Sequence, residues 1–116
     1  MTKESSDSAF SWVFNGLKAT QEKQYETAIE CFKKAIDIEP EGAYGYYYLG
    51  KTYALLNEYQ AAINNFERAI SYKPDYAAAW IEMGLAYHNI GKQPKAIECI
   101  AKGNEFASMR EKKPAK

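Results

Sequence analysis

The chain has 116 residues, which suits one domain with a single core, and its 15 basic and 15 acidic side chains cancel. Without a net charge, nothing draws the chain to nucleic acid or to an anionic membrane, so neither is expected as a partner. No apolar run is long enough to span a bilayer and the opening M-T-K-E-S-S-D-S is too polar for a secretory signal, so a cytoplasmic protein is expected.

The sequence repeats with a period of 34 residues, the spacing that separates Gly16, Gly50 and Gly84. The same spacing relates further sets of positions: Trp12, Tyr46 and Trp80; Ala28, Ala62 and Ala96; Ile29, Ile63 and Ile97; and Phe32, Phe66 and Ile100. The period defines one domain over 9–110, made of blocks 9–42, 43–76 and 77–110, with polar tails over 1–8 and 111–116.

Each block is predicted to form two helices. In block 43–76 apolar residues recur at helical spacing in two sets, which are Tyr46, Leu49, Tyr53 and Leu56, and then Ala62, Ile63, Phe66, Ala69 and Ile70. The polar pair Asn57-Glu58 separates the sets, Pro74 ends the second helix, and Asp75 can cap the next one.

Block 77–110 carries similar signals. Gly91 suits the end of its first helix, and Pro94 suits the first turn of its second. No alternating β pattern occurs in any block, so the predicted fold class is all-α.

The repeated positions form a recognisable motif. Block 43–76 reads Y-Y-Y-L-G-K-T-Y over 46–53 and block 77–110 reads W-I-E-M-G-L-A-Y over 80–87, while block 9–42 has Asn15 and Ala19 where the motif has a large apolar residue and a tyrosine. The chain therefore resembles the tetratricopeptide repeat (TPR) family. This resemblance implies a right-handed superhelix, or α-solenoid, of three helix-turn-helix repeats whose first helices line a concave groove. It also implies a scaffold or adaptor that binds proteins, rather than an enzyme.

Five tyrosines between Tyr44 and Tyr53 must be divided between core and groove. At about 100° per residue, Tyr46 and Tyr53 share one side of the helix with the motif positions and are predicted to lie in the core. The opposite side, predicted to face the groove, carries Tyr44, Tyr47, Tyr48, Lys51 and Leu55.

The equivalent positions of the other blocks extend this predicted groove with Phe10, Val13, Leu17, Ile81, Leu85, His88 and Asn89. An apolar, tyrosine-rich groove suits a hydrophobic segment or an amphipathic helix of a partner protein. The alternative for Phe10, Val13 and Leu17 is packing against neighbouring helices.

The chaperone-binding members of the family hold acidic C-terminal tails with Lys, Asn and Arg side chains. At the corresponding positions this chain has Val13, Leu17, Tyr48, Ala78 and Glu82. None of these is a cation, so binding of a chaperone tail is not expected.

Catalysis, a cofactor and a metal site are not expected either. His88 is the sole histidine, and the chain has no phosphate-binding loop or nucleophile motif. Cys31 and Cys99 lie two repeats apart, too far for a disulfide or a shared metal, and are interpreted as packing residues.

The C-terminal end offers a second function. Only E-K-K-P-A-K follows block 77–110, and Ser108 replaces the repeated proline, so the last helix is expected to continue through Phe106 and Met109 with apolar side chains partly uncovered. Either the chain belongs to a longer protein or this end packs on another copy. A structural unit that forms a homo-oligomer through the groove or this end is therefore the alternative to the adaptor.

Overall fold

The computed structural model describes residues 8–111, which form helices and no strands. The helices are α1 (Ala9–Gln21), α2 (Tyr25–Ile38), α3 (Ala43–Leu55), α4 (Tyr59–Tyr72), α5 (Ala77–Asn89) and α6 (Gln93–Glu111). The all-α prediction is confirmed. The polar tails expected over 1–8 and 111–116 lie outside the described residues, apart from Ser8 and Glu111.

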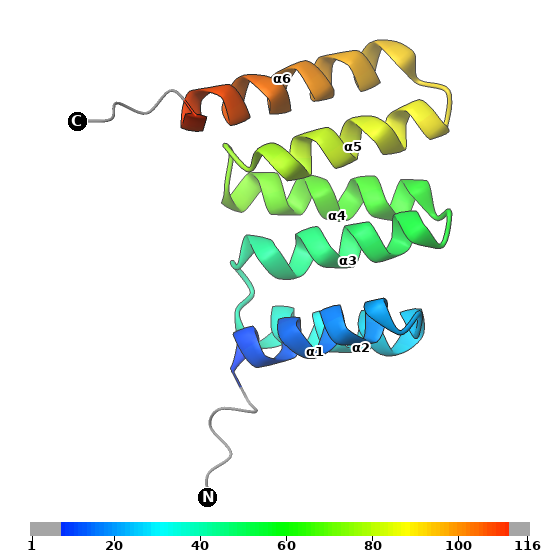
Figure 1. Ribbon diagram of the computed structural model, residues 1–116, viewed down its shortest axis with the longest axis vertical. Helices are drawn as coiled ribbons and strands as arrows, with labels where there is room; N and C mark the ends of the chain where they lie inside the picture. Colours follow the sequence, from blue (N-terminus) through cyan, green and yellow to red (C-terminus); the bar gives the residue numbers. More distant parts are fainter. Residues whose placement is uncertain (1–7, 112–116) are drawn as a thin grey trace, which may run out of the picture.

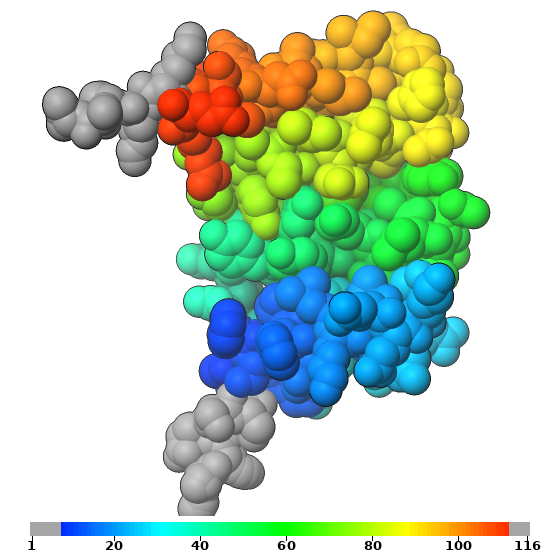
Figure 2. Space-filling view, viewed as in Figure 1, coloured from blue at the N-terminus to red at the C-terminus, as the bar shows by residue number. Residues whose placement is uncertain are grey.

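Three helix pairs stack in chain order along the longest axis of the molecule, α1–α2 at one end and α5–α6 at the other (Figure 1). The space-filling view shows the same order, because the colours follow one another along this axis (Figure 2). Each segment therefore packs mainly on its neighbours in sequence, as a repeat architecture requires.

The repeated glycines let the two helices of a pair approach each other closely. A Cβ added to Gly50 would lie 2.7 Å from Cε1 of Phe66, and one added to Gly84 would lie 2.9 Å from the carbonyl oxygen of Ala96. A Cβ on Gly16 would overlap the ring of Phe32. At these positions only glycine leaves room for the facing helix.

The first helix of each pair ends in the same turn. Lys23, Asn57 and Gly91 all have positive φ, at 62°, 64° and 82°. In the first turn the amide of Lys23 donates to the carbonyl of Thr20, and that of Gln24 donates to the carbonyl of Ala19. These bonds define a Schellman motif, which ends α1 and redirects the chain into α2.

Asp75 does not cap α5, contrary to the prediction. Tyr76 occupies the N-cap position without a side-chain hydrogen bond, while Asp75 pairs with Lys73 at 3.4 Å. The turn is held instead by Trp80, whose indole N–H donates to the carbonyl of Pro74 at 2.8 Å.

The final helix continues through Ser108, as expected in the absence of the repeated proline. Its inner side is partly covered, since the ring of Phe106 lies 6.4 Å from that of Trp80. Its outer side is bare at Ile97 and Met109, which are both exposed. Within residues 8–111 none of the helices is both long and apolar enough to cross a membrane.

Candidate functional site

A hollow of about 370 Å³ opens between α1, α2 and α3, and we call it the first hollow. Its lining is almost entirely apolar or aromatic and consists of Ala9, Phe10, Val13, Leu17, Ala35, Glu39, Gly42, Tyr44, Gly45 and Tyr48. Phe10 and Tyr44 leave 78% and 56% of their surfaces exposed, so large aromatic faces are open to a ligand.

A second hollow of about 210 Å³ lies mainly between α3 and α5. It is more polar than the first and is lined by Lys51, Ala54, Leu55, Tyr59, Glu82, Leu85, Ala86 and Asn89. Helix α3 contributes residues to both hollows, and we refer to the two together as the groove.

Nine of the twelve residues predicted for the groove line these hollows. The first hollow takes Phe10, Val13, Leu17, Tyr44 and Tyr48, and the second takes Lys51, Leu55, Leu85 and Asn89. The remaining three are Tyr47, Ile81 and His88, which lie elsewhere.

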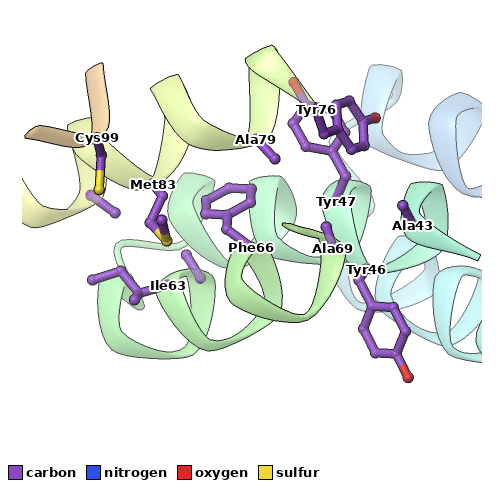
Figure 3. Packing of buried hydrophobic residues seen from close by; sticks show 12 residues of the cluster. Ala43, Tyr46, Tyr47, Ile63, Phe66, Ala69, Tyr76, Ala79, Met83 and Cys99 are labelled. Carbon is purple, nitrogen blue, oxygen red and sulfur yellow. The ribbon is translucent and has the colours of Figure 1, made fainter. Parts of the chain in front are cut away.

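Tyr47 belongs to the core, and its predicted exposure to the groove is wrong. Its side chain is only 7% exposed. Its ring lies 4.8 Å from that of Tyr76 and 5.9 Å from that of Phe66, between ring centroids, and Figure 3 shows it beside Tyr76. Burial, together with Glu82 and Tyr48, raises the pKa of Tyr47 to about 12. Helix α4 and the turn before α5 thus cover a position that faces outward on α3 alone.

Ile81 is half-buried and lines neither hollow. A Cβ added to Gly103 would lie 2.5 Å from Cγ1 of Ile81, so this side chain packs against α6. His88 is exposed, and its Nδ1 lies 3.1 Å from the side-chain oxygen of Gln93, at the turn between α5 and α6.

The two predicted core tyrosines of α3 lie where the motif indicated. Tyr46 is buried, points away from Tyr47 in Figure 3, and stacks on Tyr72 with 5.8 Å between ring centroids. Tyr53 is half-buried and packs against both clusters of buried residues. The core assignment is confirmed for Tyr46, whereas Tyr53 lies at the edge of the core.

Buried aromatic rings support the walls of the first hollow. Tyr48 stacks on Phe32 with 5.8 Å between centroids, and Tyr44 meets Tyr76 edge to face at 5.5 Å. Tyr47 also contacts Tyr48 at 4.9 Å. These contacts restrict the rotamers of the wall tyrosines, so a ligand would not have to immobilise them on binding.

Nine of the residues that line the two hollows were not among the predicted groove residues: Ala9, Ala35, Glu39, Gly42, Gly45, Ala54, Tyr59, Glu82 and Ala86. Glu39 follows the end of α2 and Tyr59 begins α4, whereas the prediction considered only the first helix of each repeat. Their contribution depends on the path of the turns, for which the helical periodicity gives no signal.

Metal ligands and thiols are the reactive groups to consider in the part of the chain that the structure describes. Among residues 8–111 there is no cluster of three or more histidine, cysteine or acidic side chains that could hold a metal ion. Cys31 and Cys99 are free and buried. Burial raises the pKa of each thiol, aided by Glu30 and Glu98 respectively, which disfavours the reactive thiolate.

Comparison with known families matches the description "TPR repeat" to residues 16–57 and 51–91 and "Tetratricopeptide repeat" to residues 77–108. The chain therefore belongs to the tetratricopeptide repeat family, and its fold is a TPR α-solenoid, as the resemblance implied. A search among curated protein sequences gave no match.

Three solved structures illustrate the likeness. MamA is 29% identical with a TM-score of 0.86, over 93% of this chain and 63% of that chain. The Sgt2 TPR domain from Aspergillus fumigatus is 25% identical with a TM-score of 0.83, over 86% and 66%. The second TPR of Spaghetti (RPAP3), solved with the HSP90 peptide SRMEEVD, is 24% identical with a TM-score of 0.82, over 84% and 91%.

The chain spans less than two thirds of the length of the MamA chains, at 63% and 61%. The RPAP3 likeness, at 24% identity, shows the fold alone. Membership of the family supports a protein-interaction module.

Proposed function

We propose that this chain is a non-enzymatic adaptor whose groove binds a hydrophobic segment, helical or extended, of a partner protein. The observation that carries the proposal is the first hollow, an open apolar concavity of about 370 Å³ whose aromatic walls are held in place from behind. Small-molecule and peptide sites are commonly concavities of this kind.

The energetics favour a large apolar anchor. Burying a leucine or phenylalanine side chain contributes about 1.5–3 kcal/mol. The ordered rings of Tyr44 and Tyr48 lower the entropic cost of binding, because little of their freedom remains to be lost. Leu55 and Leu85 in the second hollow offer a further apolar contact along the same segment.

Two phenylalanines of α1 provide a matched test. Phe10 and Phe14 are 78% and 59% exposed, so neither substitution to Asp removes a core contact, but only Phe10 lines the first hollow. Peptides selected from a random display library on the unmodified chain should lose most of their affinity for Phe10→Asp. They should retain it for Phe14→Asp. Equal binding to both variants would place the peptide site elsewhere and contradict the proposal.

We further propose that acidic chaperone tails do not bind this chain, although two RPAP3 domains of similar fold were solved with an HSP90 tail peptide. Tyr48 and Leu17 line the first hollow at positions where a tail would need a cation, and Glu82 lies in the second hollow. A labelled SRMEEVD peptide, the ligand in the RPAP3 structure, should therefore not bind in a fluorescence polarisation titration. Saturable binding of this peptide, in competition with the selected hydrophobic peptides, would show that the groove does accept an acidic tail.

The second candidate function is self-assembly through the C-terminal end. Ile97 is 67% exposed although its equivalent Ile63 is 1% exposed, so α6 keeps an apolar side chain that a stacked helix could cover. Light scattering across a range of concentrations tests this candidate. A mass that rises with concentration and falls for Ile97→Glu would favour it, and a constant monomer mass would reject it.

A further inference from the structure

We infer that the groove selects hydrophobic segments that carry a lysine or arginine beside the apolar anchor. This inference rests on the proposed function and adds the charge of the partner to it. The occupant is a basic, apolar segment of a protein, and the selectivity comes from Glu39 and Glu82.

The first hollow presents a single charge, the carboxylate of Glu39. Glu39 is exposed and follows α2, and its Oε1 lies 3.0 Å from the position of a Cβ added to Gly42, which also lines the hollow. The carboxylate therefore sits at the edge of the apolar concavity, within reach of a residue next to the buried anchor.

The second hollow contains Glu82 and Lys51, which have different surroundings. The ammonium of Lys51 lies 5.7 Å from the centre of the Tyr47 ring, over its negative face. Glu82 is half-buried and acts on the same tyrosine in the opposite sense, since its charge helps to raise the pKa of Tyr47. The ring of Tyr47 therefore attracts the ammonium of Lys51, but it offers no attraction to the carboxylate of Glu82.

Neither glutamate forms an ion pair with a basic side chain of the described residues. Within the part of the chain that the structure describes, Lys73–Asp75 is the sole ion pair, so no basic side chain bridges to Glu39 or Glu82. A cation from a partner would supply a countercharge to the glutamate of either hollow. A partner carboxylate would instead approach two unpaired carboxylates and one engaged lysine.

Lysine and arginine also suit the apolar lining. Their stems can lie along apolar surface while the charged head reaches outward. A segment whose anchor enters the first hollow could therefore place a neighbouring basic stem over Ala9 or Gly42 and its head at Glu39. Lipid and nucleic-acid phosphates would meet the same two carboxylates and be repelled.

The test is a selection from a random peptide display library on the unmodified chain, and on Phe10→Asp as the reference that lacks the exposed aromatic ring of the first hollow. Sequences enriched on the unmodified chain should carry large apolar residues flanked by Lys or Arg more often than by Asp or Glu. A synthetic copy of the most enriched peptide should bind Glu39→Gln/Glu82→Gln about threefold to tenfold more weakly at low salt. Glu41→Gln, at an exposed glutamate outside both hollows, is the matched control and should bind normally.

The possible outcomes separate the two proposals. Enrichment of apolar residues with no charge preference, or with acidic flanks, overturns the charge selection and leaves the binding groove standing. Unchanged affinity of the double glutamine variant does the same. No enrichment over Phe10→Asp overturns the groove and the charge selection together.

Discussion

Lys23 has a backbone conformation that glycine adopts more readily. Its φ is 62°, and the equivalent residue of the third repeat, Gly91, has φ of 82°. The left-handed conformation costs a residue with a Cβ about 1–2 kcal/mol. Glycine avoids this cost, but it loses more conformational entropy on folding, which offsets part of the gain. We therefore expect Lys23→Gly to raise the free energy of unfolding by about 0.5–1 kcal/mol, measured by urea denaturation.

Lys23→Ala is the control for this prediction, because it removes the charged side chain and keeps the strain. It should give no gain in stability. If the alanine variant were as stable as the glycine variant, the gain would come from losing the lysine side chain, and the conformational argument would be wrong.

The burial of Tyr47 makes the stability of the protein depend on pH in the alkaline range. Its pKa is about 12 in the folded chain against an ordinary 10.0, because burial disfavours the phenolate. As the pH rises from about 10 to about 12, the unfolded state loses this proton first, so stability falls across that window and is unaffected below it. Burial also raises the pKa of Tyr76, which lies beside Tyr47, so this residue adds to the loss of stability in alkali.

We therefore expect Tyr47→Phe to lose less stability than the unmodified chain when urea denaturation is moved from about pH 8 to about pH 11. The ring is kept, so the packing against Tyr76 and Phe66 stays. The two proteins should be of similar stability at the lower pH. An equal loss for both would show that Tyr47 ionises as readily in the folded state as in the unfolded state.

At the scale of the helix pair, Gly50 sets how closely α3 and α4 approach. A Cβ there would lie 2.7 Å and 2.9 Å from two ring carbons of Phe66 and 3.1 Å from the carbonyl oxygen of Ala62. Helix propensity favours alanine over glycine by about 1 kcal/mol, but overpacking costs about 1–3 kcal/mol, and the backbone carbonyl cannot move aside without moving the helix. We expect Gly50→Ala to lower stability.

A double-mutant cycle isolates the contact that opposes this Cβ. Phe66→Leu should reduce the penalty of Gly50→Ala, because the smaller side chain leaves room near the added methyl group. Urea denaturation of the four proteins gives the coupling. If Gly50→Ala stabilised the protein, or if the two substitutions changed stability additively, the contact with Phe66 would not oppose the added Cβ. The helices would then move apart without cost.

The elements could be predicted from the sequence because the signals that define them are local. The apolar spacing gave the helices, and Gly91 gave the end of α5 through its positive φ. Tyr47 and Ile81 were misplaced because a helical wheel shows one helix, whereas Tyr76 and Gly103 cover these side chains from another. Glu39 was missed for a related reason, since a turn places it at the groove.

At the scale of the molecule, stacking determines what each repeated position contributes. Ile63 and Ile97 occupy the same position in successive repeats, yet Ile63 is 1% exposed and Ile97 is 67% exposed. The next repeat covers Ile63, where Met83 belongs to the same buried cluster (Figure 3). In α6 the flanking positions have become Gln93 and Asn104, which correspond to Tyr59 and Ile70 of α4. This outer face is thus partly adapted to water.

The same substitution at the two positions should therefore have very different effects. Ile63→Ala is expected to cost about 2–5 kcal/mol through lost burial and a cavity, whereas Ile97→Ala should change stability by less than about 0.5 kcal/mol. Urea denaturation at low and high protein concentration measures both. A large cost of Ile97→Ala that appears only at high concentration would mean that a second copy covers α6 in solution, which is what the self-assembly candidate requires. A large cost independent of concentration would instead contradict the exposure of Ile97 itself.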